Sequence, residues 1–169
     1  GHGGRAVVGR RAAPGPGAPR VAVPTGVLWP AVCNPDRRRA TRAAARRIYF
    51  PDPERAPAGS HFVKVRRHLG IYDDVASRLA PLPSGAVAMR ALADTPEPGL
   101  IGCTQVTEIL YTPGVVLVGN LPPGFELATV YAASVTAQVR DAALARQWIA
   151  MLAGADAREL RERGGFMTE

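Results

Sequence analysis

Hydrophobic and polar positions alternate in an orderly way only from residue 48 onward. Short apolar runs predict strands at 48–50, 100–103, 115–118 and 127–135. The last run is long enough for a central strand buried on both faces. Apolar residues at helical spacing predict helices over about 60–69, 73–80, 85–93, 141–153 and 156–163. Strands that alternate with helices indicate an α/β fold.

The predicted helix over 60–69 has the clearest amphipathic pattern. Ser60 is expected to cap its first turn, and Gly70 is expected to end it. Its buried stripe is expected to contain Phe62, Val65 and Leu69. The charged positions are expected to face water, and they are Lys64, Arg66, Arg67 and His68.

Residues 1–47 differ from the rest in charge and composition. The 169-residue chain has a formal charge of +7, and residues 1–47 hold ten arginines and one acid, Asp36. The remaining residues, 48–169, are slightly acidic, so all of the basic excess lies in the first segment. A folded nucleic-acid reader would have its basic residues on a folded element, so this distribution argues against one. Prolines interrupt the apolar islands at 21–23 and 27–29, and residues 37–47 could form one Ala/Arg helix. We expect a poorly structured or atypical segment, with binding to RNA or a membrane surface as the alternative.

Several classes of function lack their signatures in this sequence. It contains no apolar stretch of about 18 residues, no phosphate-binding glycine loop and no nucleophile elbow. The start, Gly1 to Gly4, has no apolar signal core, so we expect no signal peptide in this chain. Cys33 and Cys103 are expected to be unpaired thiols. His61 and His68 lie about 10 Å apart on one helix, too far to hold one metal ion together. We expect no metal site and no cofactor.

The loop from Asp52 to Ser60 is a candidate anion site. It runs from the end of a predicted strand, through residues with small side chains, into the start of a predicted helix. The backbone N–H groups of Ala58, Gly59 and Ser60 would point outward there, where the helix dipole favours an anion. The alternative is an ordinary helix start that binds only water.

A series of short motifs from residue 48 to the end carries a family resemblance. They include Tyr49-Phe50-Pro51-Asp52-Pro53, Pro57-Ala58-Gly59-Ser60-His61-Phe62, Gly102-Cys103-Thr104-Gln105-Val106-Thr107-Glu108-Ile109-Leu110, Thr129-Val130-Tyr131-Ala132-Ala133 and Gly164-Gly165-Phe166. In this order and spacing, the chain resembles molybdate-type substrate-binding proteins of bacterial ABC transporters. The resemblance implies a type 2 periplasmic-binding fold, in which a small anion binds between two α/β lobes.

The resemblance also implies a division of the chain. Residues 48–135 correspond to the second lobe, and residues 136–169 correspond to C-terminal helices that return to the first lobe. Residues 1–47 do not resemble the first lobe, most of which is therefore expected to be lacking.

Ligand-binding positions are implied residue by residue. Ala58, Gly59 and Ser60 match donors at a helix start, and Ile101 matches a backbone donor. Thr129 stands where several molybdate binders have tyrosine, while Tyr131 lies two residues further along.

The function implied is the binding of a small oxyanion such as molybdate for an ABC transporter permease. The location implied is the periplasm or the outside of the cell. Some proteins similar to this branch of the family, such as aconitate isomerase, act on small tricarboxylic acids. In that alternative His61 would be the acid/base, although none of the matched cleft positions is Arg or Lys. We therefore expect a binding protein more than an enzyme.

Overall fold

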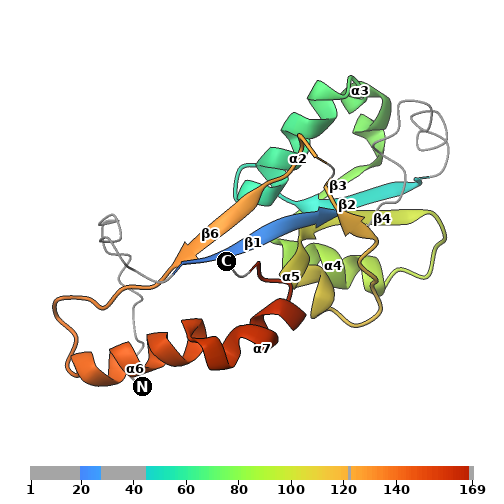
Figure 1. Cartoon of the computed structure of the whole chain (residues 1–169). Helices are drawn as coiled ribbons and strands as arrows, with labels where there is room; N and C mark the ends of the chain where they lie inside the picture. Colours follow the sequence, from blue (N-terminus) through green and yellow to red (C-terminus); the bar gives the residue numbers. More distant parts are fainter. Residues whose placement is uncertain (1–19, 28–44, 122, 168–169) are drawn as a thin grey trace, which may run out of the picture.

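The computed structural model describes residues 20–27, 45–121 and 123–167, and a six-stranded sheet forms its centre (Figure 1). The strands run in the order β3-β2-β4-β1-β5, and β6 pairs with β1 outside this path. Their bounds are β1 Arg20–Val27, β2 Arg47–Pro51, β3 Leu79–Leu82, β4 Leu100–Gln105, β5 Gly119–Asn120 and β6 Ala128–Ala132. The α-helices are α2 Pro57–His68, α3 Tyr72–Val75, α4 Gly85–Ala93, α5 Val106–Leu110, α6 Ala142–Ala153 and α7 Arg158–Arg163. Two short 3₁₀ helices are η2 Ala76–Arg78 and η3 Ala155–Ala157.

The sheet has a parallel half and an antiparallel half. Strand β2 lies between β3 and β4 and is parallel to both, so the carboxyl ends of these three strands meet at one edge. Strand β1 is antiparallel to β4, β5 and β6. Ligands of open parallel sheets bind beyond the carboxyl ends of the strands, which makes that edge the first place to look for a site.

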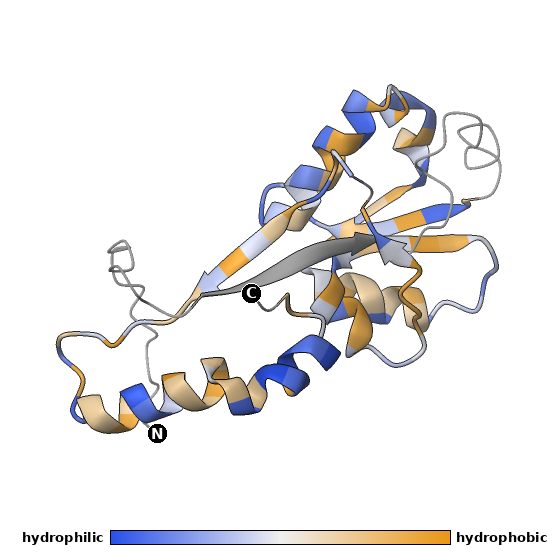
Figure 2. Ribbon diagram, viewed as in Figure 1, coloured by the Kyte–Doolittle hydropathy of each residue, from blue (hydrophilic) through white to orange (hydrophobic). Residues whose placement is uncertain are grey.

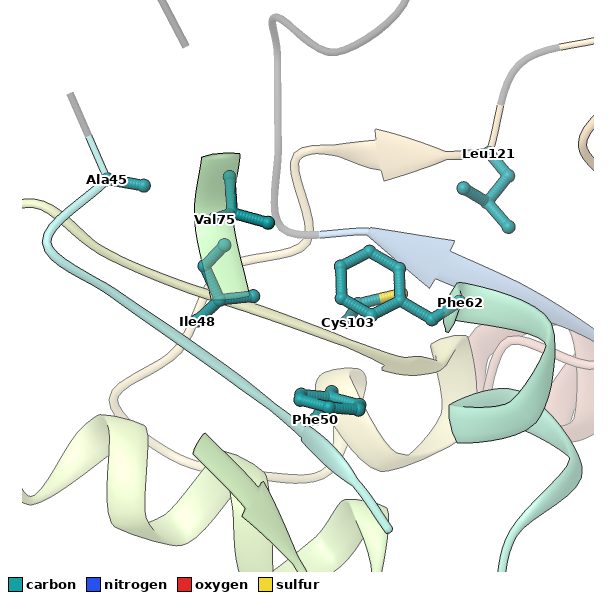
Figure 3. Close-up of a cluster of buried hydrophobic side chains, with 7 residues drawn as sticks. All are labelled: Ala45, Ile48, Phe50, Phe62, Val75, Cys103 and Leu121. Atoms are coloured by element: carbon teal, nitrogen blue, oxygen red, sulfur yellow. The ribbon is translucent and has the colours of Figure 1, made fainter. Parts of the chain in front are cut away.

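Strand β2 supplies side chains to both hydrophobic layers of the core. Ile48 and Phe50 point to the face covered by α2 and α3, where they pack with a cluster that Figure 3 shows. That cluster also contains Ala45, Phe62, Val75, Cys103 and Leu121. Tyr49 points the other way and packs against Ala88, Met89 and Ile109 of α4 and α5. This alternation gives a helix–sheet–helix sandwich (Figure 1).

The helices predicted over 85–93 and 141–153 are confirmed, and each begins after a capping side chain. The Ser84 hydroxyl accepts a hydrogen bond from the N–H of Val87 at the start of α4. The Asp141 carboxylate does the same for Leu144 in α6, at 2.9 Å. Helix α2 begins at Pro57, earlier than predicted, and the Ser60 N–H donates to the Ala56 carbonyl inside the helix. Ser60 is therefore not the cap of this helix.

Two strand predictions were wrong, and the strands β1, β3 and β5 were missed. Residues 115–118 form no strand, and β6 is mostly exposed, since among the described strands it pairs with β1 alone. Strand β3 contains Pro81, which lacks the N–H that a central strand needs. A proline is tolerated there because β3 lies at the end of the strand order.

The expected exposure of Arg66 was also wrong. Its side chain is 2% exposed and lies against the rings of Phe50, Phe62 and Tyr72. These rings come from three separate elements, so the helical pattern of α2 alone could not reveal that they surround it. Phe62, Val65 and Leu69 are buried as predicted.

Residues 20–27 form strand β1, although they fall in the segment that was expected to lack regular structure. A helix was considered for residues 37–47, but residues 37–44 lie outside the described residues, and Arg47 begins β2. Cys33 also lies outside the described residues. Cys103 is a free and buried thiol. None of the helices in the described part of the chain has the length and apolar character needed to cross a bilayer.

Helix α6 presents an apolar stripe without burying a single residue (Figure 2). The stripe consists of Leu144, Trp148, Met151 and Leu152, and each of them is more than half exposed.

Candidate functional site

A pocket of about 180 Å³ lies at the carboxyl edge of the parallel strands. We call it the strand-end pocket. Its lining comes from the ends of β2 and β4, the starts of α2 and α4, helix α5 and strand β6. The lining residues are Pro51, Arg55, Ala56, Pro57, Ala58, Pro83, Ser84, Gly85, Thr104, Gln105, Glu108, Thr129 and Tyr131.

The start of α2 brings unpaired N–H groups to this pocket. Pro57 is the first helical residue and has no N–H, while the N–H of Ala56 donates to the Asp52 carbonyl at 2.9 Å. The next two N–H groups, of Ala58 and Gly59, have no acceptor among the described residues. A side chain at Gly59 would overlap the carbonyl of Pro51, so glycine lets the helix start close to the end of β2. These free donors, at the positive end of the helix dipole, favour an anion.

The start of α4 is arranged differently, because a protein carboxylate already occupies it. Glu108 Oε1 accepts a hydrogen bond from the N–H of Ala86 at 3.2 Å. Glu108 Oε2 accepts one from the hydroxyl of Thr104, which is fully buried. A Cβ at Gly85 would overlap both the Glu108 carboxylate and the Thr104 hydroxyl. Gly85 therefore makes room for this carboxylate.

Strand β6 closes another side of the pocket. Thr129 and Tyr131 belong to its lining, and the Tyr131 hydroxyl donates to Gln105 Oε1 at 3.1 Å. This hydrogen bond joins β6 to the end of β4, which are not neighbours in the sheet.

The structure brings some of the predicted site residues together and separates others. Ala58 and Thr129 line the pocket, and Gly59 and Ser60 follow Ala58 in the first turn of α2. Ile101 lies near the beginning of β4, where it packs against the core. Three residues of extended chain, about 10 Å, separate it from Thr104.

His61 has a partner away from the strand-end pocket. Its Nε2 forms a 2.7 Å hydrogen bond with the carbonyl of Phe125, and His61 is absent from the pocket lining. This contact joins α2 to the loop before β6. The ring is thus engaged in a structural hydrogen bond, in contrast with the acid/base role considered for an isomerase.

Sequence reasoning missed the pocket residues near the ends of β3 and β4. Ser84 and Gly85 follow β3 after Pro83, and Thr104 and Gln105 are the last two residues of β4. The available signal was a strand followed by a short turn and a capped helix. The cap at Ser84 is visible in the sequence, but Pro81 argued against a strand before it, so β3 was not predicted. Glu108 carries no local signal, since its contacts are with α4 and β4.

Arg55 and Glu108 are the charged residues in the lining that the structure describes. The Arg55 side chain is 67% exposed and lies 3.8 Å from a carboxylate oxygen of Asp52. Such an exposed pair contributes little to stability. Within the described residues, no group of three His, Cys, Asp or Glu side chains is placed to hold a metal ion. The donors that the pocket offers are mostly neutral.

Two solved structures resemble this one. The periplasmic molybdate-binding protein of Azotobacter vinelandii has 16% sequence identity and a TM-score of 0.62, and the match covers 91% of this chain and 69% of that chain. A substrate-binding domain assigned to a molybdenum ABC transporter of Clostridium difficile has 13% identity and a TM-score of 0.61, with 90% and 65% covered. The chain thus spans about two thirds of these relatives. The likeness shows a fold of the type 2 periplasmic-binding kind.

The comparison with curated proteins finds no match. A family profile, in contrast, matches nearly the whole chain, residues 6–167. This range includes most of residues 1–47, which the motifs quoted above do not cover. The chain belongs to the family of bacterial extracellular solute-binding proteins.

Proposed function

We propose that the chain binds a small tetrahedral oxyanion of the molybdate type in the strand-end pocket and delivers it to the membrane permease of an ABC transporter. The observation that carries this proposal is that the N–H groups of Ala58 and Gly59, at the start of α2 beside the pocket, have no acceptor among the described residues. The solute-binding family and the names of the two solved relatives support the same function.

Neutral donors are sufficient to bind such an ion. The N–H groups of Ala58 and Gly59, with the hydroxyls of Ser60 and Thr129, would surround one side of the oxyanion. Hydrogen bonds to a charged group contribute about 1.5–3 kcal/mol each, so a few of them give useful affinity. Arg55 would add long-range attraction. This site would work in the periplasm or outside the cell, where a transporter collects its substrate.

Thermal melts of the purified chain test the proposal. Molybdate, tungstate, sulfate, phosphate, citrate and trans-aconitate are each added in turn. A ligand at a hundredfold excess over its Kd adds about 2.7 kcal/mol of stability, which raises the Tm visibly. We expect an oxyanion to do this. A chain that melts cooperatively and responds to none of them would contradict the proposal.

A pair of threonine variants then places the ligand. Thr129→Val removes a hydroxyl from the pocket lining with little change of shape, and we expect it to weaken oxyanion binding about tenfold. Thr136→Val makes the same change at an exposed position in the turn after β6 and serves as the control. Equal affinities in the two variants would show that the ion does not touch Thr129.

A further inference from the structure

Two helices of more than two turns begin at the strand-end pocket, and among the described residues a carboxylate side chain accepts a hydrogen bond from a first-turn N–H of only one of them. Helix α2 has 12 residues, and its Ala58 N–H has no acceptor in the part of the chain that the structure describes. Helix α4 has 9 residues, and the Ala86 N–H in its first turn is bound to Glu108. Glu108 belongs to neither helix, because it projects from α5.

The Glu108 carboxylate is held as a bound carboxylate ligand would be. One oxygen accepts a hydrogen bond from a main-chain N–H at the start of α4, and the other accepts one from the buried hydroxyl of Thr104. Gly85 provides the space, since any Cβ there would overlap both groups. The side chain thus occupies the place where a second anionic group of a ligand would find its donors.

We propose that Glu108 is a specificity-determining residue that restricts the strand-end pocket to ligands with a single anionic centre. Its carboxylate accepts a hydrogen bond from the Ala86 N–H at the start of α4 and repels another carboxylate by like charge. A tetrahedral oxyanion needs only the α2 side, whereas a di- or tricarboxylate needs a second anion site as well. Excluding the wrong ligand by an internal charge is a recognised route to specificity. This inference rests on the proposed function only in taking the strand-end pocket as the binding site.

The wild-type chain gives the first test. Titration calorimetry with sodium molybdate, succinate and citrate measures the preference directly. We expect molybdate to bind at least tenfold more tightly than either carboxylate. Succinate or citrate binding as tightly as molybdate would overturn the inference.

Removal of the internal carboxylate gives the second test. In Glu108→Ala, the Ala86 N–H and the Thr104 hydroxyl lose their acceptor, so we expect a lower Tm. Acetate at millimolar concentration should restore much of that loss by taking the vacated place, and succinate should now bind. Glu97→Ala removes an exposed carboxylate outside the strand-end pocket, and its Tm should not respond to acetate.

The outcomes separate this inference from the proposed function. If molybdate fails to stabilise the wild type, the proposed function fails, while acetate rescue still decides the role of Glu108. A Glu108→Ala chain that folds only in acetate supports the inference. If acetate affects Glu108→Ala no more than Glu97→Ala, or leaves it unfolded, Glu108 does not act as a tethered anion and the inference is overturned.

Discussion

The guanidinium carbon of Arg66 lies 4.3 Å from the centre of the Phe62 ring, one helical turn earlier in α2. The rings of Phe50 and Tyr72 approach the same carbon at 4.8 and 5.4 Å. Arg66 Nε donates to the Phe62 carbonyl, but its two terminal nitrogens have no acceptor among the described residues. Burial lowers the pKa of Arg66 from its ordinary value to about 10. Three aromatic faces and the Phe62 carbonyl are therefore the contacts that compensate this buried charge.

Replacing Arg66 with methionine is expected to leave the free energy of unfolding unchanged or to raise it by about 1 kcal/mol. Methionine keeps the contacts with the rings and removes the two buried terminal nitrogens that lack an acceptor among the described residues. A buried polar group left unpaired costs about 1–3 kcal/mol. Arg66→Ala should instead lose about 2–4 kcal/mol, because it leaves a cavity between the rings. Urea unfolding of the two variants measures both effects. Equal losses would mean that the charge itself stabilises the fold.

Cys103 is expected to make the protein sensitive to alkaline pH. Burial raises the pKa of its thiol from 9.0 to about 12, against a smaller opposite effect of the Arg66 charge. Because the folded-state pKa is the higher one, this contribution to stability is complete below pH 9 and disappears as the pH rises towards 12. Cys103→Ala should therefore lose less stability than the wild type between these two pH values, as measured by urea unfolding.

The same burial predicts slow chemistry at the Cys103 thiol. In a Cys33→Ser background, a thiol reagent should modify Cys103 only as fast as the chain unfolds, because the thiolate is the reactive form. Rapid modification of the native protein at neutral pH would contradict this expectation.

Gly85 is expected to be intolerant of any side chain. Gly85→Ala would displace the Glu108 carboxylate and the Thr104 hydroxyl from each other and from the start of α4, at a cost of about 1–3 kcal/mol. Gly119→Ala is the matched control, because a Cβ there meets no atom within 4 Å. We expect the control to stay within about 0.5 kcal/mol of the wild type. Similar losses in the two variants, by urea unfolding, would argue against the tight packing at Gly85.

Much of the helical structure could be predicted because its signals are local. Ser84 and Asp141 each cap a helix within three residues of their own position, and the spacing of Phe62, Val65 and Leu69 identifies the buried face of α2. The sheet could not be predicted as well, since it depends on pairing. Pro81 signals an interruption, and only the edge position of β3 makes a strand possible there.

In the candidate site, too, residues with local sequence signals could be predicted, and residues that depend on contacts between elements could not. Ala58 could be found because a helix start after a strand end is a sequence pattern. Glu108 could not, because its partners Ala86 and Thr104 lie on other elements. Arg66 is a similar case, since a charged residue on an amphipathic helix is normally solvated and its burial depends on rings that the fold brings from elsewhere.

The last turn of the chain offers a test of how α7 is attached to α5. Gly165 has a φ of +86°, and a Cβ there would lie 2.7 Å from Val106 Cγ1 and 2.9 Å from Leu110 Cδ1. Gly124 has almost the same φ, +87°, but a Cβ there meets no atom within 4 Å. Replacing either glycine with alanine adds the backbone strain of the left-handed region, about 1–2 kcal/mol.

Only Gly165→Ala adds a steric conflict with α5, so we expect it to cost about 1–3 kcal/mol more than Gly124→Ala. The additional loss should be accompanied by faster amide hydrogen exchange in α7, because displacing Phe166 and its neighbours releases the end of that helix from α5. Urea unfolding and hydrogen exchange of the two variants measure these effects. Equal losses and unchanged exchange would show that strain alone limits position 165, and that α7 does not depend on close packing against Val106 and Leu110.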